Sequence, residues 1–332
     1  MHELAFPLLV ALIALALAFD FLNGLHDAAN SIATVVSTQL LSPIKAVIFA
    51  AVGNFLAYWI VGLHVAETVG KGIVDKDIVT PAVVFGALIG AMFWNVVTWL
   101  KGIPSSSSHA LIGGLLGAGI AANGFGAVES EGTTKTLLAI VISPMIGFIL
   151  AMALMLLTSV LFQRSTPRKA NNTFKVLHLF SSAAYSISHG GNDAQKTMGI
   201  ITVLLYSTGY LGGEFHVPEW VVLSCYLAIS LGTLSGGWRI IRTMGTGLTK
   251  LNHHSGFCAS TAGSIVVFGA SAMGIPVSTT HAITGSVVGT GAARRASAVR
   301  WTVATRVVTA WFITIPASGL VGAAFYLLTQ LF

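Results

Sequence analysis

The chain carries the stretch Gly24-Leu25-His26-Asp27-Ala28-Ala29-Asn30-Ser31 inside a long apolar run, and it repeats this stretch as Gly190-Gly191-Asn192-Asp193-Ala194-Gln195-Lys196-Thr197. A second pair follows in the same order, as Gly102-Ile103-Pro104-Ser105-Ser106-Ser107-Ser108-His109-Ala110 and Gly274-Ile275-Pro276-Val277-Ser278-Thr279-Thr280-His281-Ala282. In each pair the copies lie roughly half of the 332-residue chain apart. This pattern predicts an internal duplication whose apolar runs are interrupted at matched places.

The composition predicts that lipid surrounds most of the chain. Hydrophobic residues make up 55% of the sequence, charged residues only 8%, and the mean hydropathy is +0.83. Soluble domains are about one quarter charged. The net charge of +6 would also suit a nucleic-acid-binding protein. Basic residues on cytoplasmic loops of a membrane protein explain it better, so no nucleic-acid partner is expected.

Apolar runs alternate with polar loops, and several exceed the roughly 20 residues that one membrane crossing needs. The runs cover about 4–36, 46–66, 82–122, 136–163, 176–211, 220–236, 257–291 and 301–332. We therefore predict an all-α polytopic membrane protein, and we read the first run as a retained segment rather than a signal peptide. Gly24, Gly190 and Gly191 are expected to let two of these helices unwind, so that backbone carbonyls could ligate a cation.

The most polar segment, 164–175, separates the two copies. It contains four basic residues and no acidic one: Arg164, Arg168, Lys169 and Lys175. We interpret it as a cytoplasmic linker between a first repeat, 1–163, and a second repeat, 176–332.

Loop charges then predict the orientation of each repeat. We expect the protein in the cell membrane. With the linker on the cytoplasmic side, the basic loops 237–256 and 291–300 also lie on the cytoplasmic side, and both termini lie on the outer side. The run 257–291 must then begin and end on one side. Each of its halves has about 15–16 residues and spans about 23 Å, too short for a crossing. We predict an inverted repeat with re-entrant hairpins at about 82–122 and 257–291, meeting near the midplane.

Three carboxylates lie deep in apolar sequence, at Asp20, Asp27 and Asp193. Each costs at least about 2.5–3.5 kcal/mol at the centre of a membrane helix, which favours a functional role. Asp27 and Asp193 occupy equivalent positions and are predicted to bind ions. Asp20 is matched by Ser186, and its role stays open between a structural partner and an ion-binding group.

The Pro-Ser and Pro-Val-Ser-Thr tracts favour an anion, because proline begins helices and helix N-termini offer free N–H groups. The candidate ligands are Ser105, Ser106, Ser107, Ser108, Ser278, Thr279 and Thr280. Carboxylates beside an anion require either an intervening cation or an oxyanion that still carries a proton. Phosphate carries a proton near neutral pH and sulfate does not, so phosphate is the predicted substrate.

These duplicated elements resemble the inorganic phosphate transporter (PiT) family, in its bacterial low-affinity form. The resemblance implies an inverted-repeat helical bundle, phosphate uptake driven by sodium or protons, and a homodimer. It also implies that Asp27, Asn30 and Asp193 serve the phosphate–cation centre.

Two positions depart from the family's sodium-type motif, Gly-Ala-Asn-Asp-x-x-Asn: His26 and Lys196 replace asparagines. A lysine beside Asp193 can replace a bound cation, and histidine titrates near physiological pH, so a proton is favoured over sodium. The bacterial branch also suggests metal–phosphate as cargo. His26 could instead be a neutral hydrogen-bonding residue, and Lys196 a simple ion-pair partner. The predicted coupling residues are Asn23, His26, Asp27, Asn192, Asp193 and Lys196, and Lys196 is also a predicted phosphate ligand.

The sequence thus predicts a secondary active transporter that imports inorganic phosphate with a cation by alternating access. No cofactor, metal site or catalytic residue is expected, because no metal-ligand spacing or nucleophile motif occurs, and Cys225 and Cys258 stand at no motif spacing. The alternatives are a sulfate or other oxyanion carrier of the same fold and a membrane-embedded hydrolase.

Overall fold

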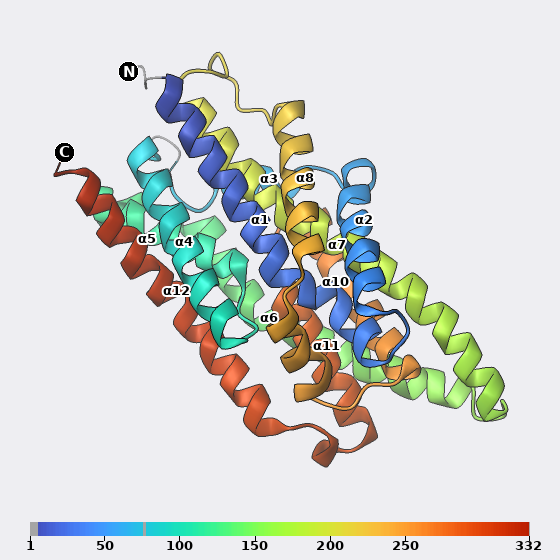
Figure 1. The fold of residues 1–332 in the computed structure, drawn as a ribbon. Helices are drawn as coiled ribbons and strands as arrows, with labels where there is room; N and C mark the ends of the chain where they lie inside the picture. Colours follow the sequence, from blue (N-terminus) through green and yellow to red (C-terminus); the bar gives the residue numbers. More distant parts are fainter. Residues whose placement is uncertain (1–5, 76–77, 332) are drawn as a thin grey trace.

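The computed structural model describes residues 6–75 and 78–331, and the regular structure in them is helical apart from one isolated bridge between Val74 and Val128. Seven helices of the described part are long and apolar enough to cross a membrane, or eight if one bent pair counts as a span. The prediction of an all-α polytopic membrane protein is confirmed (Figure 1). The prediction that both termini lie on the outer side of the membrane concerns residues 1–5 and 332, which are not among the described residues.

The two halves of the chain contain the same succession of helices. Each begins with a long helix, continues with a medium and a short helix, forms a helical hairpin and ends with a long helix. The first half has α1 (Phe6–Ser37), α2 (Pro43–Ile60), α3 (His64–Lys71), α4 (Pro81–Lys101), α5 (Ser107–Asn123) and α6 (Ser130–Leu161). The second half has α7 (Pro167–Ser207), α8 (Glu219–Ser235), α9 (Trp238–Arg242), α10 (His253–Ala272), α11 (Thr279–Arg294) and α12 (Trp301–Thr329).

The halves interlock rather than stand side by side. Helix α12 packs along the hairpin of the first half, α4 and α5, while α6 packs along the hairpin of the second half, α10 and α11. In the same reciprocal way α1 packs on α8, and α7 on α2. Each half therefore completes the core of the other, and the hairpins reach the centre of the bundle.

Glycines let the hairpin helices lie directly on the long helices of the opposite half. A Cβ on Gly117 of α5 would lie 2.0 Å from the carbonyl oxygen of Gly319 in α12. Similarly, a Cβ on Gly285 of α11 would lie 2.2 Å from the carbonyl oxygen of Pro144 in α6. Small residues at such contacts allow backbones to approach closely in a membrane, where packing drives helix association.

The unwinding expected at Gly24, Gly190 and Gly191 is wrong, because α1 and α7 run through both motifs as continuous helices. Close packing explains these glycines instead. A Cβ on Gly24 would lie 2.1 Å from the carbonyl oxygen of Ile229 in α8, and one on Gly190 would lie 2.6 Å from the backbone of Asn54 in α2. Helix interruptions do fall at the hydroxyl tracts, between α4 and α5 and between α10 and α11, and a further bend of 65° follows α8.

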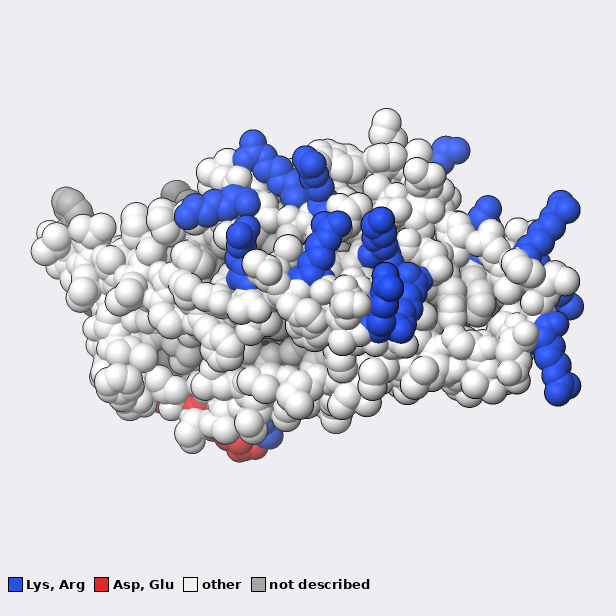
Figure 2. Space-filling model, turned by 90° about the horizontal axis from the view of Figure 1, so that it is seen from below, with Lys and Arg blue, Asp and Glu red and all other residues white. Residues whose placement is uncertain are grey.

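The linker 164–175 is mostly helical, because α7 begins at Pro167 with Thr166 as its N-cap. Its basic residues are exposed. Figure 2 shows many Lys and Arg side chains on the face seen from below. Helix α1 begins and α12 ends toward the opposite end (Figure 1). The side of the membrane on which this basic face lies stays a prediction.

We predict that Gly117→Val destabilises the fold, because the added side chain would meet backbone that cannot move aside. Overpacking typically costs about 1–3 kcal/mol, and here it separates α5 from α12. The measurement is the melting temperature of the detergent-solubilised protein. Gly126→Val is the matched control, since a Cβ at Gly126 meets nothing within 4 Å. Equal melting temperatures for the two variants would contradict this account of the contact.

Candidate functional site

The two hydroxyl tracts begin the second helices of the hairpins. Ser106 is the N-cap of α5, and its Oγ accepts a hydrogen bond from the backbone N–H of His109 at 3.2 Å. Ser278 caps α11 in the same way, at 3.1 Å from the N–H of His281. The helix N-termini, with their free N–H groups and positive dipole ends, are thus fixed at both tips, as an anion site requires.

The histidines that follow the tracts bring the two tips together. The rings of His109 and His281 meet edge to face with centroids 4.5 Å apart, and the ring of His281 also stacks on Trp311 at 3.7 Å. Pro144 has no N–H to offer the carbonyl of Ile140, and Nδ1 of His281 lies 3.4 Å from that oxygen. The two hairpin tips are therefore in contact, while their position near the midplane of the membrane stays a prediction.

Lys196 of α7 connects both tips to Asp193. Its Nζ donates to Asp193 Oδ1 at 2.5 Å, to Ser108 Oγ at 2.5 Å and to the carbonyl oxygen of Val277 at 2.8 Å. The other oxygen of Asp193 accepts a hydrogen bond from Thr279 Oγ1 at 2.9 Å. One buried ion pair thus holds a residue from each hairpin.

Asp27 of α1 forms the opposite side of this centre. Its Oδ1 lies 2.7 Å from Nδ1 of His26, whose Nε2 lies 3.0 Å from the hydroxyl of Thr98 in α4. Asn30 donates to Thr280 Oγ1 at 2.8 Å, and Thr280 lies 3.5 Å from Asp27. The two repeats therefore provide similar scaffolds but different charges.

His189 lies close to both carboxylates and is the residue that the sequence analysis missed. Ligand atoms of Asp27, His189 and Asp193 all lie within 4.8 Å of one another, close enough to share one cation. His189 Nε2 lies 3.2 Å from Asp193 Oδ2, and its Nδ1 lies 3.0 Å from Asn54 Oδ1. The sequence predicted no metal site, because ligands from two distant motifs have no local spacing. The available signal was that His189 stands four residues before Asp193, where the first copy has Asn23.

Comparison with known proteins identifies the scaffold. Residues 23–322 match the model of the phosphate transporter family. The chain belongs to that family. The resemblance drawn from the four motifs is therefore confirmed.

Relatives of this chain match nearly its whole length. A protein of Rhizobium meliloti (strain 1021) named "Probable low-affinity inorganic phosphate transporter" is 62% identical over 328 residues, 99% of this chain and 98% of that protein. A Bacillus subtilis (strain 168) protein of the same name is 43% identical over 98% of each chain. A solved structure titled "The sodium-dependent phosphate transporter" matches with a TM-score of 0.91 and 26% identity, over 98% of this chain and 100% of that one.

Not every predicted ligand of this phosphate transporter family member faces the centre. Ser105 is turned away, since its Oγ lies 2.7 Å from Thr314 Oγ1 of α12. The Asn192 amide donates to Ser271 Oγ at 2.8 Å and so braces the second hairpin. Asn23 lies beside Asp20. The hydroxyl of Ser107 is buried without a hydrogen-bond partner in the described part of the chain, which leaves it free for a ligand.

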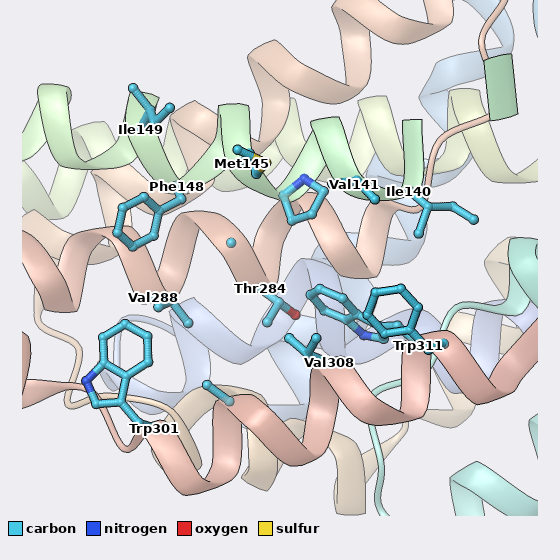
Figure 3. A pocket seen from close by; sticks show the side chains of 14 residues that line it. Ile140, Val141, Met145, Phe148, Ile149, Thr284, Val288, Trp301, Val308 and Trp311 are labelled. Atoms are coloured by element: carbon cyan, nitrogen blue, oxygen red, sulfur yellow. The ribbon is translucent and has the colours of Figure 1, made fainter. Parts of the chain in front are cut away.

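One apolar cavity lies outside this centre. Figure 3 shows an apolar groove of about 510 Å³ between α6, α11 and α12, lined by residues such as Met145, Phe148 and Val308. Such a lining offers almost no donors to an oxyanion. The motif residues themselves are sealed, since Asp27, Lys196 and the facing hydroxyls are at most 2% exposed. The structure is thus closed on both sides of the centre.

We predict that Ser108→Ala weakens phosphate uptake strongly, whereas Ser105→Ala changes its apparent affinity little. Ser108 contacts Lys196 and Asp193, but the Ser105 hydroxyl bonds to α12. Losing a hydrogen bond to a charged group costs about 1.5–3 kcal/mol, or roughly ten- to hundredfold in affinity. Concentration dependence of labelled phosphate uptake in proteoliposomes measures both variants. A larger effect of Ser105→Ala would overturn this assignment of ligands.

Proposed function

We propose that this chain imports inorganic phosphate by symport with a proton, through alternating access of one central site. The observation that supports it best is the position of Lys196, between Asp193 and both hairpin tips. An ammonium group tethered there supplies the positive charge that a bound sodium ion would otherwise bring. The protein then needs a different, mobile ion to couple to a gradient.

Phosphate suits the donors and acceptors that converge on the centre. Donors come from the N-termini of α5 and α11 and from hydroxyls such as that of Ser107. The acceptors are Asp27 and Asp193, which would repel an oxyanion without a proton. A phosphate that keeps a proton donates a hydrogen bond from its O–H group to a carboxylate. Sulfate has no such group and leaves that acceptor unpaired, at a cost of about 1–3 kcal/mol.

The interlocked halves and the way in which each hairpin tip is held support alternating access. The first tip is held just after α9, where Oγ1 of its C-cap residue Thr243 donates to the carbonyl of Gly102 at 2.8 Å. The second tip lies against α3, and a Cβ on Gly274 would lie 3.2 Å from the carbonyl oxygen of His64. Loosening one tip at a time would open the sealed site to one side only.

The carboxylate–histidine group also supports a second form of the cargo. Asp27, His189 and Asp193 offer two carboxylate oxygens and an imidazole nitrogen to one cation. Imidazole and carboxylate together suit a divalent metal, so a metal–phosphate complex would fit the same centre.

Uptake under separately imposed gradients tests the coupling ion. We predict that an inward proton gradient drives phosphate accumulation by the wild type, while a sodium gradient does not. In Lys196→Asn the tethered charge is lost, so proton-driven uptake should fall and sodium should gain influence. The measurement is labelled phosphate in proteoliposomes, with and without a divalent metal. Sodium-driven uptake by the wild type at the level of proton-driven uptake would refute the proposal.

Competition tests the substrate. Excess unlabelled phosphate should abolish labelled phosphate uptake, and the same concentration of sulfate should leave it nearly unchanged. Asp193→Asn should remove driven uptake although the protein still reaches the membrane, because Lys196 loses its partner. If sulfate inhibits as well as phosphate does, the chain is a general oxyanion carrier.

A further inference from the structure

Asp20 is a buried carboxylate that the central site does not use. It lies on α1, about two helical turns before Asp27, and its side chain is 0% exposed. Neither of its oxygens makes a hydrogen bond of good geometry within the described residues, and no ion pair is formed there either. A bare carboxylate in an apolar interior is costly, so Asp20 must bind a proton or a cation.

The neighbours of Asp20 are other oxygen atoms that lack partners. Asn23, one turn further along α1, and Thr197 of α7 lie beside the carboxylate. Neither Asn23 Oδ1 nor Thr197 Oγ1 has a hydrogen-bond partner in the part of the chain that the structure describes. A carboxylic acid could donate its hydrogen to either of these two acceptors. Protonation therefore gives the carboxyl group a hydrogen bond to one of these acceptors.

The charges around Asp20 do not neutralise it. From α7 it faces Asp193 and Lys196, and from α8 it faces Cys225 and Tyr226. The ammonium of Lys196 is already engaged by Asp193, Ser108 and Val277. The titratable side chain of α4 is Lys101, which is exposed.

A proton fits this place better than a metal ion. Metal ions bound by oxygen usually take about six or more ligands, many of them backbone carbonyls or waters. Helices α1 and α7 are continuous here, so their carbonyls are used in helical hydrogen bonds. The side chains alone offer too few oxygens.

We propose that Asp20, with Asn23 and Thr197, is the proton-binding site of the transporter, separate from the phosphate centre at Asp27 and Asp193. A proton from the outer water converts the carboxylate to the acid, and the same proton leaves to the inner water when the site opens inward. This removes one negative charge that faces Asp193 and so favours anionic phosphate in the centre. By linkage, bound phosphate favours the proton equally. The inference rests on the proposed function.

The test compares proton-driven accumulation with phosphate exchange in the absence of a gradient. Asp20→Asn imitates the permanently protonated acid. We expect it to lose accumulation driven by a proton gradient, down to the level without a gradient, and to keep exchange of internal for external labelled phosphate. Ser186→Ala, which changes the equivalent position of the second repeat, is the matched control and should keep both activities. Asp27→Asn should lose both.

Each failure points to a different conclusion. Full proton-driven accumulation by Asp20→Asn would overturn this site and leave the proposed function intact. A wild type without any proton drive would overturn the proposed coupling itself. If Asp20→Asn does not fold, Thr197→Val replaces it and should shift the pH at which proton-driven uptake is half-maximal, because one acceptor is removed. An unchanged pH profile in Thr197→Val would then overturn the site.

In infrared difference spectra, the band of a protonated carboxylic acid should be present in the wild type and absent in Asp20→Asn.

Discussion

The ion pair between Lys196 and Asp193 is the interaction on which the centre depends. Both groups are buried, and either one alone would be an uncompensated charge in the interior. Removing one partner of such a pair typically costs about 3–5 kcal/mol. The same ammonium also bonds to Ser108 and to the carbonyl of Val277, one from each hairpin. The same ammonium group therefore compensates the charge of Asp193 and holds the two tips in their closed arrangement.

The interlocked packing couples the two hairpin tips to the long helices of the fold. Each hairpin rests on the last long helix of the other half, through contacts so close that glycine is required. A tip cannot move without the helix on which it lies, because the backbones are in direct contact. A change in the hydrogen-bond partners of Lys196 would consequently move groups of helices rather than single side chains.

Much of this arrangement was predictable, because it depends on local pattern. Apolar runs, loop charges and the position of Pro104 and Pro276 were sufficient for the helices and the hairpins, whereas anion binding at the tips stays a prediction. The glycines were misread, since Gly24 and Gly190 serve equally as helix breakers and as flat contact surfaces, and only the neighbouring helix distinguishes these uses. Ser105 and Ser108 could not be separated either, because their directions depend on how the turn joins α5.

His189 shows the second limit of the sequence. Its partners are one turn away on α7, on α1 and on α2, so only the folded chain brings them together. The duplicated pattern nevertheless held a clue, because the histidine stands where the first copy has Asn23. Equivalent positions occupied by different polar residues deserve the same scrutiny as identical ones.

The functional differences between the two copies have a physical reason. An exact duplication would place a lysine at position 30 as well as at 196, and an aspartate at 186 as well as at 20. Two ammonium groups would then compete for the same hydroxyls at the hairpin tips, and each added buried carboxylate would need its own proton or cation. The common scaffold suits the tetrahedral anion, which can be held by the same helix end from both sides. The groups that carry charge differ between the repeats, as His26, Lys196 and Asp20 do.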